Sequence, residues 1–325
     1  MKYIDIPKLG KVAKISLGCD HYGETIDEKI AAEQLDYYIT QGGNLLDTAR
    51  LYGQQVDEGP GTSEILLGKY LKHVDRSKLI IATKGGHPHL GHMDRPRLDR
   101  SSLYSDIEAS LDQLGTPVDI YFLHRDWPEY EVGPIVETLN EFVQKGYTRI
   151  IGASNWSAER IKEANMYAQK HNLQGFEFSE LQYSLAKTDT ETWGDSTIEI
   201  MGSSSSPKSF YEETMLPYMC FTSQGKGIFS KVIRGKEYEM SERARKRFLT
   251  DENRKRIDRV RILTEKLSVT PEEIVLSYIT SQKSNAIAII GSSKLEQIKT
   301  SLENTDLTLS QEMLDYLENG TTISL

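Results

Sequence analysis

The segment QGGNLLDTARLYG, residues 41–53, contains the pattern that decides the fold. Residues 44–46 read as the end of a buried strand, and the glycines before them end a helix. A carboxylate, Asp47, follows the strand directly, and a phenol, Tyr52, lies in the turn behind it. The unit to look for in the rest of the chain is therefore a short apolar strand that ends in a polar residue and is joined to a helix.

This unit recurs along the chain, because short apolar strands alternate with amphipathic helices. Strands are expected over residues 15–18, 44–46, 78–83, 118–123, 149–153, 176–181, 217–221 and 286–290. Helices are expected over residues 27–42, 61–73 (capped by Thr62 or Ser63), 99–115, 135–146 and 157–171, and in the tail after Ser310. Such alternation predicts parallel strands joined by right-handed crossovers.

The number of units favours one fold class over its main competitor. Eight units fit a closed (β/α)8 TIM barrel better than an open, doubly wound α/β sheet. The open sheet usually carries G-x-G-x-x-G after its first strand, and this chain lacks that fingerprint there. We expect a single barrel catalytic domain over residues 1–325, with a C-terminal helix and long loops at the C-terminal face of the barrel.

Two segments interrupt the alternation. Residues 187–208 are polar and rich in serine, which predicts a loop that either acts as a lid or lies inert. Residues 231–261 are rich in lysine and arginine but interleaved with acidic residues, which is typical of a solvated helical face.

Composition limits the classes of function and partner. A net charge of −9 over 325 residues argues against a protein that binds nucleic acid or a membrane surface. No apolar run is long enough to span a bilayer. The two cysteines, Cys19 and Cys220, offer neither a disulfide framework nor metal-ligand spacing. The sequence thus predicts a cytoplasmic protein without a metal site, and it indicates no oligomeric state.

Four polar side chains at or just after the expected strands suggest a chemistry. They are Asp47, Tyr52, Lys84 and His124. In a barrel of this kind the C-terminal strand ends meet at one mouth. Asp47 would keep Lys84 protonated, and the Lys84 ammonium would lower the pKa of the Tyr52 phenol from about 10 toward neutrality. With His124 orienting a carbonyl oxygen, this set would donate a proton during hydride transfer from a bound cofactor.

Four motifs extend this interpretation to a family. In order, "LLDTARLYG", "IATKGG", "DIYFLHRD" and "IGASNWS" resemble the aldo-keto reductases across nearly the whole chain. The resemblance implies a barrel that binds NADPH, with NADH as the other possibility. It also implies a small-molecule carbonyl substrate, an aldehyde or ketone, that is reduced to an alcohol or formed in the reverse reaction. The tetrad of that family matches Asp47, Tyr52, Lys84 and His124.

The resemblance also implies which residues hold the cofactor. Ser154 and Asn155 match the pair at the nicotinamide carboxamide, and Phe221 matches the ring that stacks on the nicotinamide. Ser292, Ser293 and Lys294 would take the 2′-phosphate. Glu180 stands where the family usually has glutamine. The full implied set is Cys19, Asp20, Asp47, Ser154, Asn155, Glu180, Phe221, Thr222, Ser223, Gln224, Gly225, Ser292, Ser293, Lys294 and Gln297.

Aromatic residues in the loops after the strands are expected to line the substrate pocket, and two other functions are compatible with the sequence. Tyr22, Trp127, Trp156 and part of residues 187–208, including Trp193, are expected to line the substrate pocket. One alternative is a barrel aldolase that forms a Schiff base at Lys84. The other is a regulatory subunit that senses redox state through a bound cofactor.

Overall fold

Eight parallel strands close into a barrel in the computed structural model, which describes residues 1–54 and 61–323. The expected (β/α)8 TIM barrel is confirmed, and the predicted strands agree with the observed ones to within about two residues. In chain order the strands are β3 (Ile15–Gly18), β4 (Leu45–Asp47), β5 (Ile80–Gly85), β6 (Val118–Leu123), β7 (Thr148–Ser154), β8 (Phe178–Gln182), β9 (Tyr218–Phe221) and β10 (Ala286–Ile290). The barrel closes where β10 pairs with β3.

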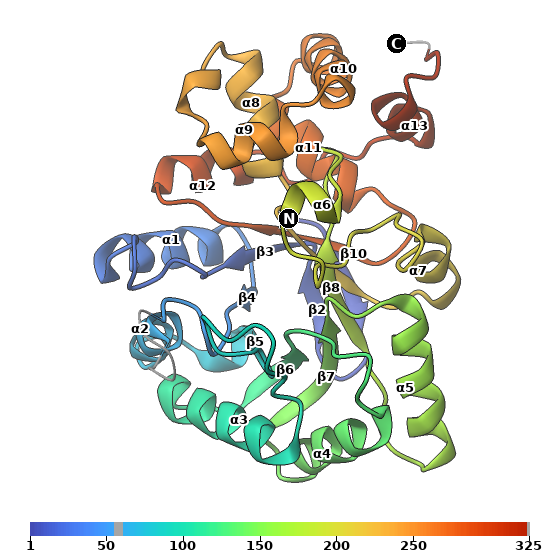
Figure 1. Ribbon diagram of the computed structural model, residues 1–325. Helices are drawn as coiled ribbons and strands as arrows, with labels where there is room; N and C mark the ends of the chain where they lie inside the picture. The colour runs from blue at the N-terminus through green and yellow to red at the C-terminus, as the bar shows by residue number, and fades with distance from the viewer. Residues whose placement is uncertain (55–60, 324–325) are drawn as a thin grey trace.

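Helices connect consecutive strands and cover the outside of the barrel (Figure 1). Among the described residues, the first five connections each contain one α-helix: α1 (Glu28–Thr40), α2 (Thr62–Leu71), α3 (Arg100–Leu114), α4 (Val132–Gln144) and α5 (Ala158–Lys170). The connection from β8 to β9 contains α6 (Thr190–Trp193) and α7 (Lys208–Thr214). After β9 come α8 (Ile228–Ile233), α9 (Glu242–Phe248), α10 (Asp251–Leu267) and α11 (Pro271–Thr280), and after β10 come α12 (Leu295–Leu302) and α13 (Gln311–Asn319).

Side-chain caps explain where several helices begin. Asp27, Asp99, Ser157 and Ser310 each accept a hydrogen bond from a backbone N–H in the first turn of the helix that follows. The expectation that Thr62 or Ser63 caps α2 is wrong. Gly61 occupies the N-cap position and makes no side-chain bond.

The hydroxyls of Thr62 and Ser63 hold a neighbouring loop instead of capping α2. Thr62 donates to the carbonyl of Tyr22 at 2.9 Å, and Ser63 donates to the carbonyl of Cys19 at 2.7 Å. The start of α2 therefore anchors the loop that follows β3.

A hairpin that sequence reasoning missed closes the bottom of the barrel. Strands β1 (Tyr3–Ile6) and β2 (Gly10–Ala13) pair antiparallel. Ile6 and Val12 pack into the cluster of apolar side chains inside the barrel. Asn44, just before β4, bonds to the backbone of β2 through both its amide oxygen and its amide nitrogen. This end of the barrel is therefore filled, and polar residues gather at the opposite strand ends.

The two segments that interrupt the alternation are both structured. Residues 187–208 contain α6 and are tied down, because Asn253 bonds to both the N–H and the carbonyl of Lys187 at 2.8 Å. Ile200 also forms a bridge to Gln182. Residues 231–261 contribute to α8, α9 and α10, which gather at the top of Figure 1. Within residues 1–54 and 61–323, no helix is both long and apolar enough to cross a membrane.

Candidate active site

A buried lysine lies at the centre of the polar strand ends. The Nζ atom of Lys84, at the end of β5, donates to Asp47 Oδ1 at 2.6 Å, to the carbonyl of Thr48 at 3.0 Å and to Tyr52 Oη at 3.2 Å. The Lys84 side chain is completely buried and that of Asp47 nearly so. Since Tyr52 Oη accepts from the ammonium, its own O–H is available to an acceptor in the cavity.

A second carboxyl group faces the same ammonium. Glu180, on β8, places Oε1 3.4 Å from Lys84 Nζ and is also almost fully buried. Burial would lower the pKa of Lys84, but the neighbouring carboxyl groups, that of Asp47 first and that of Glu180 second, more than offset this and hold it well above its usual value. Lys84 is therefore a charged ammonium, as the sequence predicts.

The expectation for the pKa of Tyr52 is wrong in direction. Burial raises the pKa of Tyr52 above its usual value, and the Lys84 ammonium lowers it by less than burial raises it. The resting phenol is therefore fully protonated. The ammonium of Lys84 still favours the phenolate that forms when the proton leaves, because it lies directly at Oη.

His124 is placed to contact a bound carbonyl in its neutral form. Burial lowers the pKa of His124 well below its usual value, and the neighbouring His87 and Arg125 lower it further. Its ring meets the Tyr52 ring edge to face, with centroids 5.7 Å apart. The Nδ1 atom of His124 is buried and has no hydrogen-bond partner among the described residues. A neutral imidazole still has one N–H to donate to an oxygen beside Tyr52.

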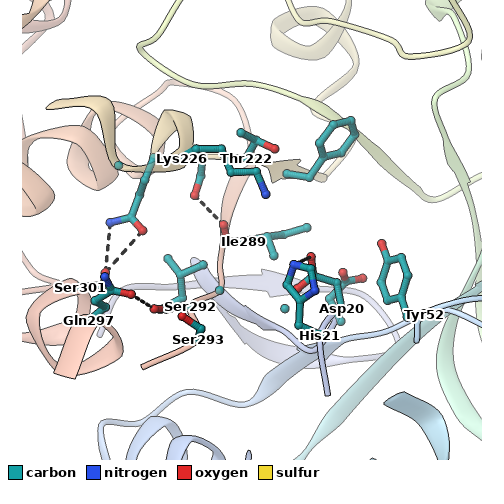
Figure 2. A pocket seen from close by; sticks show the side chains of 18 of the residues that line it. Asp20, His21, Tyr52, Thr222, Lys226, Ile289, Ser292, Ser293, Gln297 and Ser301 are labelled. Atoms are coloured by element: carbon teal, nitrogen blue, oxygen red, sulfur yellow. Dashed lines mark hydrogen bonds and ion pairs between the residues drawn. The ribbon is translucent and has the colours of Figure 1, made fainter. Parts of the chain in front are cut away.

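An elongated cavity of about 830 Å³ opens over these residues. Asp47, Tyr52, His124 and Glu180 line its inner end. Figure 2 shows Tyr52 at one side of the cavity and Gln297 far from it, beside Ser301. A volume near the upper end of the usual range for ligand pockets fits an extended ligand.

Most of the residues that the resemblance implied for a cofactor line this cavity. They are Asp20, Asp47, Asn155, Glu180, Phe221, Thr222, Ser223, Gln224, Ser292, Ser293 and Gln297. Cys19, Ser154, Gly225 and Lys294 are not among the lining residues. The thiol of Cys19 is buried beneath the first loop, and Lys294 occupies the N-cap position of α12.

The pair Ser154–Asn155 is held by the protein itself. Asn155 Nδ2 donates to the carbonyl of His124 and to Ser154 Oγ, both at 3.2 Å, and its Oδ1 accepts from the N–H of Glu199. These bonds use both amide hydrogens of Asn155 and one lone pair of its oxygen. Asn155 also has a positive φ of 60°, which asparagine tolerates better than most residues.

The turn after β9 has an unusual backbone. Thr222, Gly225, Lys226 and Gly227 all have positive φ, between 55° and 78°. Thr222 is β-branched, so this conformation is costly for it and is typical of a functional turn. Ser223 Oγ fixes the turn by donating to the carbonyl of Ile289 on β10 at 2.5 Å (Figure 2).

The aromatic residues proposed for the substrate pocket lie elsewhere. Tyr22 and Trp156 are completely buried, and neither they nor the half-buried Trp127 line the cavity. Trp156 donates from Nε1 to the backbone carbonyl of Arg125 at 3.1 Å, so it positions a residue that lines the cavity without lining it itself. Trp193, from residues 187–208, does line the cavity.

Several residues that line the cavity were missed by sequence reasoning. His87, Arg125 and Asp195 lie near His124, and Arg125 forms an ion pair with Asp195 at 3.5 Å that links the β6 end to residues 187–208. Lys226 and Lys231 also line the cavity, and Lys231 Nζ lies 3.4 Å from the carbonyl oxygen of Lys226. The motif "DIYFLHRD" gave a signal for Arg125, because it follows His124 directly, but no signal links it to Asp195.

Metal ligation has no support in the described part of the chain. No group of three or more histidine, cysteine, aspartate or glutamate side chains there can hold a metal ion.

Comparisons with known proteins agree with this barrel fold. The family model described as "Aldo/keto reductase family" matches residues 14–320. The Escherichia coli (strain K12) protein "Protein tas" is 28% identical, in an alignment that covers 98% of this chain and 97% of that protein. "Norsolorinic acid reductase B" of Dothistroma septosporum is 24% identical, over 95% of this chain and 78% of that protein.

A solved structure is similar to the barrel over almost its full length. It is a crystal structure of a thermostable aldo-keto reductase in complex with the inhibitor epalrestat, with a TM-score of 0.71 and 22% identity over 98% of this chain and 99% of that one. At this identity the likeness concerns the fold. The match of the family model over residues 14–320 shows that the chain belongs to the aldo/keto reductase family, whose members are carbonyl oxidoreductases that use nicotinamide cofactors.

Proposed function

We propose that this protein is an NADP-dependent reductase of small aldehydes or ketones and also catalyses the reverse oxidation. The observation that carries the proposal is the buried chain Asp47–Lys84–Tyr52, which ends in a phenol that lines the cavity. We treat residues 1–325 as one catalytic domain, and a cytoplasmic location stays a prediction.

The residues present fit a nicotinamide dinucleotide. The cavity is long, and Phe221 offers an aromatic ring beside the inner polar groups. Backbone N–H groups in the turn of Thr222–Gly227 suit a pyrophosphate, because a turn in which a residue of negative φ, Gln224, precedes a left-handed one, Gly225, can form an anion-binding concavity. Ser292, Ser293 and Gln297 line the outer end, where they would hold the adenosine part. When bound, this cofactor supplies the hydride for carbonyl reduction.

The choice of NADPH over NADH rests on the positive charge that lines the cavity. Lys226 and Lys231 line it, and no ion pair involving either is found among the described residues. Arg234, which also lines the cavity, pairs with Glu272 at 2.6 Å. Two ammonium groups without carboxylate partners suit a 2′-phosphate better than a free hydroxyl. These lysines take the role that the sequence gave to Lys294.

The proposed roles of the chain's own residues follow from their geometry. His124 donates its N–H to the carbonyl oxygen and positions it beside Tyr52. Tyr52 gives its proton to that oxygen as the carbonyl carbon accepts hydride. Lys84 stabilises the phenolate that remains, and Asp47 keeps Lys84 charged. The near-complete burial of Asp47 and Lys84 strengthens these interactions, because little water screens them.

Neither alternative is favoured by a specific observation. A Schiff base needs a neutral amine, whereas the carboxylate of Asp47 helps to hold the pKa of Lys84 well above its usual value. No feature of the described residues points to a regulatory partner.

The test is a panel of aldehydes and ketones with NADPH and with NADH, followed by the near-ultraviolet absorbance of the reduced cofactor. The proposal expects oxidation of NADPH that depends on an added carbonyl. Trapping of a borohydride-reduced adduct on Lys84, without any oxidation of cofactor, would instead establish the aldolase.

A further inference from the structure

Glu180 is a carboxyl group that the proposed proton transfer does not use. An ammonium has three hydrogens to donate. Those of Lys84 are taken by Asp47, Thr48 and Tyr52 at 2.6–3.2 Å, while Glu180 lies farther away at 3.4 Å. Lys84 therefore already has a carboxylate partner without Glu180.

The surroundings of Glu180 disfavour a second negative charge. The titratable or charged groups that face it come from β4, β5, β9, the turn after β4 and the loop after β6: Asp47, Lys84, Cys220, Tyr52 and Arg125. Arg125 is itself paired with Asp195. If Asp47, Glu180 and Asp195 were all charged, two cations would face three anions, two of which are almost fully buried. One carboxyl group is expected to hold a proton under these conditions.

One oxygen of Glu180 is free to meet a ligand. Its Oε2 atom is buried, has no hydrogen-bond partner among the described residues, and belongs to a side chain that lines the inner end of the cavity. The amide of Asn155, which also lines the cavity, already has both of its hydrogens bonded. A protonated Glu180 could therefore donate from Oε2 to a ligand oxygen that the amide of Asn155 cannot serve.

We propose that Glu180 carries a proton in the ligand-free protein and donates it as a hydrogen bond from Oε2 to an oxygen of the ligand bound at the inner end of the cavity. The protonation stands on the geometry of the protein alone. The identity of the ligand as the nicotinamide end of NADPH rests on the proposed function.

The direction of the pKa shift agrees with the charge count. Burial, and then the carboxylate of Asp47, raise the pKa of Glu180 to about 8. At neutral pH the neutral form therefore predominates. A neutral carboxylic acid offers one donor and one acceptor, like an amide, whereas a carboxylate only accepts. Loss of the proton removes the donor, so affinity for the ligand should fall as the pH rises.

Protonation is tested without any ligand, by NMR titration of the ¹³C-labelled glutamate carboxyl groups. Glu64 provides a matched control, because it is also buried, its pKa is raised to about 7, and it bonds to Thr83 rather than to Lys84. Two glutamate signals should titrate far above the usual value of about 4.3. Glu180→Gln should remove one and Glu64→Gln the other. A Glu180 signal that titrates near about 4.3 would overturn the proposal.

Donation to the ligand is tested by the dissociation constant of NADPH, measured by fluorescence across the pH range around about 8. For the wild type, the affinity should fall as the pH rises through about 8, by about tenfold or more in total, because the charged form lacks the donor. Glu180→Gln, whose amide keeps its donor, should bind with little dependence on pH in this range. Glu64→Gln should behave like the wild type.

The outcomes separate this proposal from the proposed function. Wild-type affinity that stays constant with pH, or a Glu180→Gln protein whose affinity falls as the wild type's does, would overturn the donor role. A different outcome is that NADPH fails to bind at any pH while the Glu180 signal of the ligand-free protein still titrates far above the usual value. That result would overturn the proposed function and the identity of the ligand, but Glu180 would still be protonated in the ligand-free protein.

Discussion

Asp47 and Glu180 should substitute for each other as the partner of Lys84, and a double-mutant cycle measures this directly. Asp47→Asn removes the carboxylate at 2.6 Å. Glu180, at 3.4 Å, should then lose its proton and become the counterion. With an effective dielectric constant of about 20, the attraction falls from about 6 to about 5 kcal/mol, so this variant should lose about 1.5 kcal/mol of stability. Glu180→Gln removes a neutral acid and should cost less than about 1 kcal/mol.

The double variant should cost more than the sum of the two single changes. It leaves the Lys84 ammonium buried without a carboxylate, and breaking a buried pair in this way costs about 3–5 kcal/mol. The expected coupling is therefore about 2 kcal/mol. Urea unfolding of the four proteins near neutral pH, followed by far-UV circular dichroism, gives the four free energies of unfolding.

A second cycle supplies the control. Asp47→Asn combined with Glu64→Gln removes two buried carboxyl groups, but Glu64 bonds to Thr83 and has no contact with Lys84. These changes should add within about 0.5 kcal/mol. Coupling below about 0.5 kcal/mol in the Asp47–Glu180 cycle would refute the reasoning that the two carboxyl groups share one ammonium.

Three further changes test other parts of the account. Lys226→Ala should weaken NADPH binding about tenfold or more while leaving NADH affinity nearly unchanged, because one charge-assisted contact to the 2′-phosphate is lost; equal effects on both cofactors, measured by fluorescence titration, would contradict that role. The native pKa of Glu64, about 7, lies above that of an exposed glutamate, so the stability from this group is present at low pH and lost as the pH rises through about 7. The free energy of unfolding in urea, taken as Glu64→Gln minus wild type, should therefore increase by about 3 kcal/mol between pH of about 5 and about 8. If this difference is the same at both pH values, Glu64 titrates normally. Trp156→Phe removes the N–H that donates to the backbone carbonyl of Arg125 at 3.1 Å, and it should raise KM for the aldehyde or ketone substrate about tenfold without changing the Kd of NADPH. Steady-state kinetics with an unaltered KM would show that this hydrogen bond does not position Arg125.

The barrel was predictable from sequence because each strand ends in a recognisable way. Apolar runs such as residues 118–123 are bounded by turn or helix signals, and their alternation with helices fixes parallel topology. The β1–β2 hairpin was missed although it has a local signal. Apolar Ile4 and Ile6 precede the turn "PKLG", in which Lys8 and Gly10 adopt positive φ.

The site was only partly predictable, because burial and side-chain direction are set by the whole fold. Asp47, Tyr52, Lys84 and His124 follow strands directly, so the topology alone brings them together. Trp156 also follows a strand, but its side chain turns inward and packs against Phe176. The pKa of Tyr52 is not readable from its neighbours in the motif, because its direction depends on how much water the folded chain removes.

Turnover by Tyr52→Phe, measured together with its affinity for NADPH, tests the central claim most directly. The variant keeps the ring that contacts His124 and loses only the hydroxyl that Lys84 contacts at 3.2 Å. NADPH should bind about as tightly as to the wild type, while kcat for carbonyl reduction falls about 10²- to 10⁴-fold, the usual contribution of a general acid. A variant that binds NADPH normally and reduces carbonyls at the wild-type rate would show that another group supplies the proton.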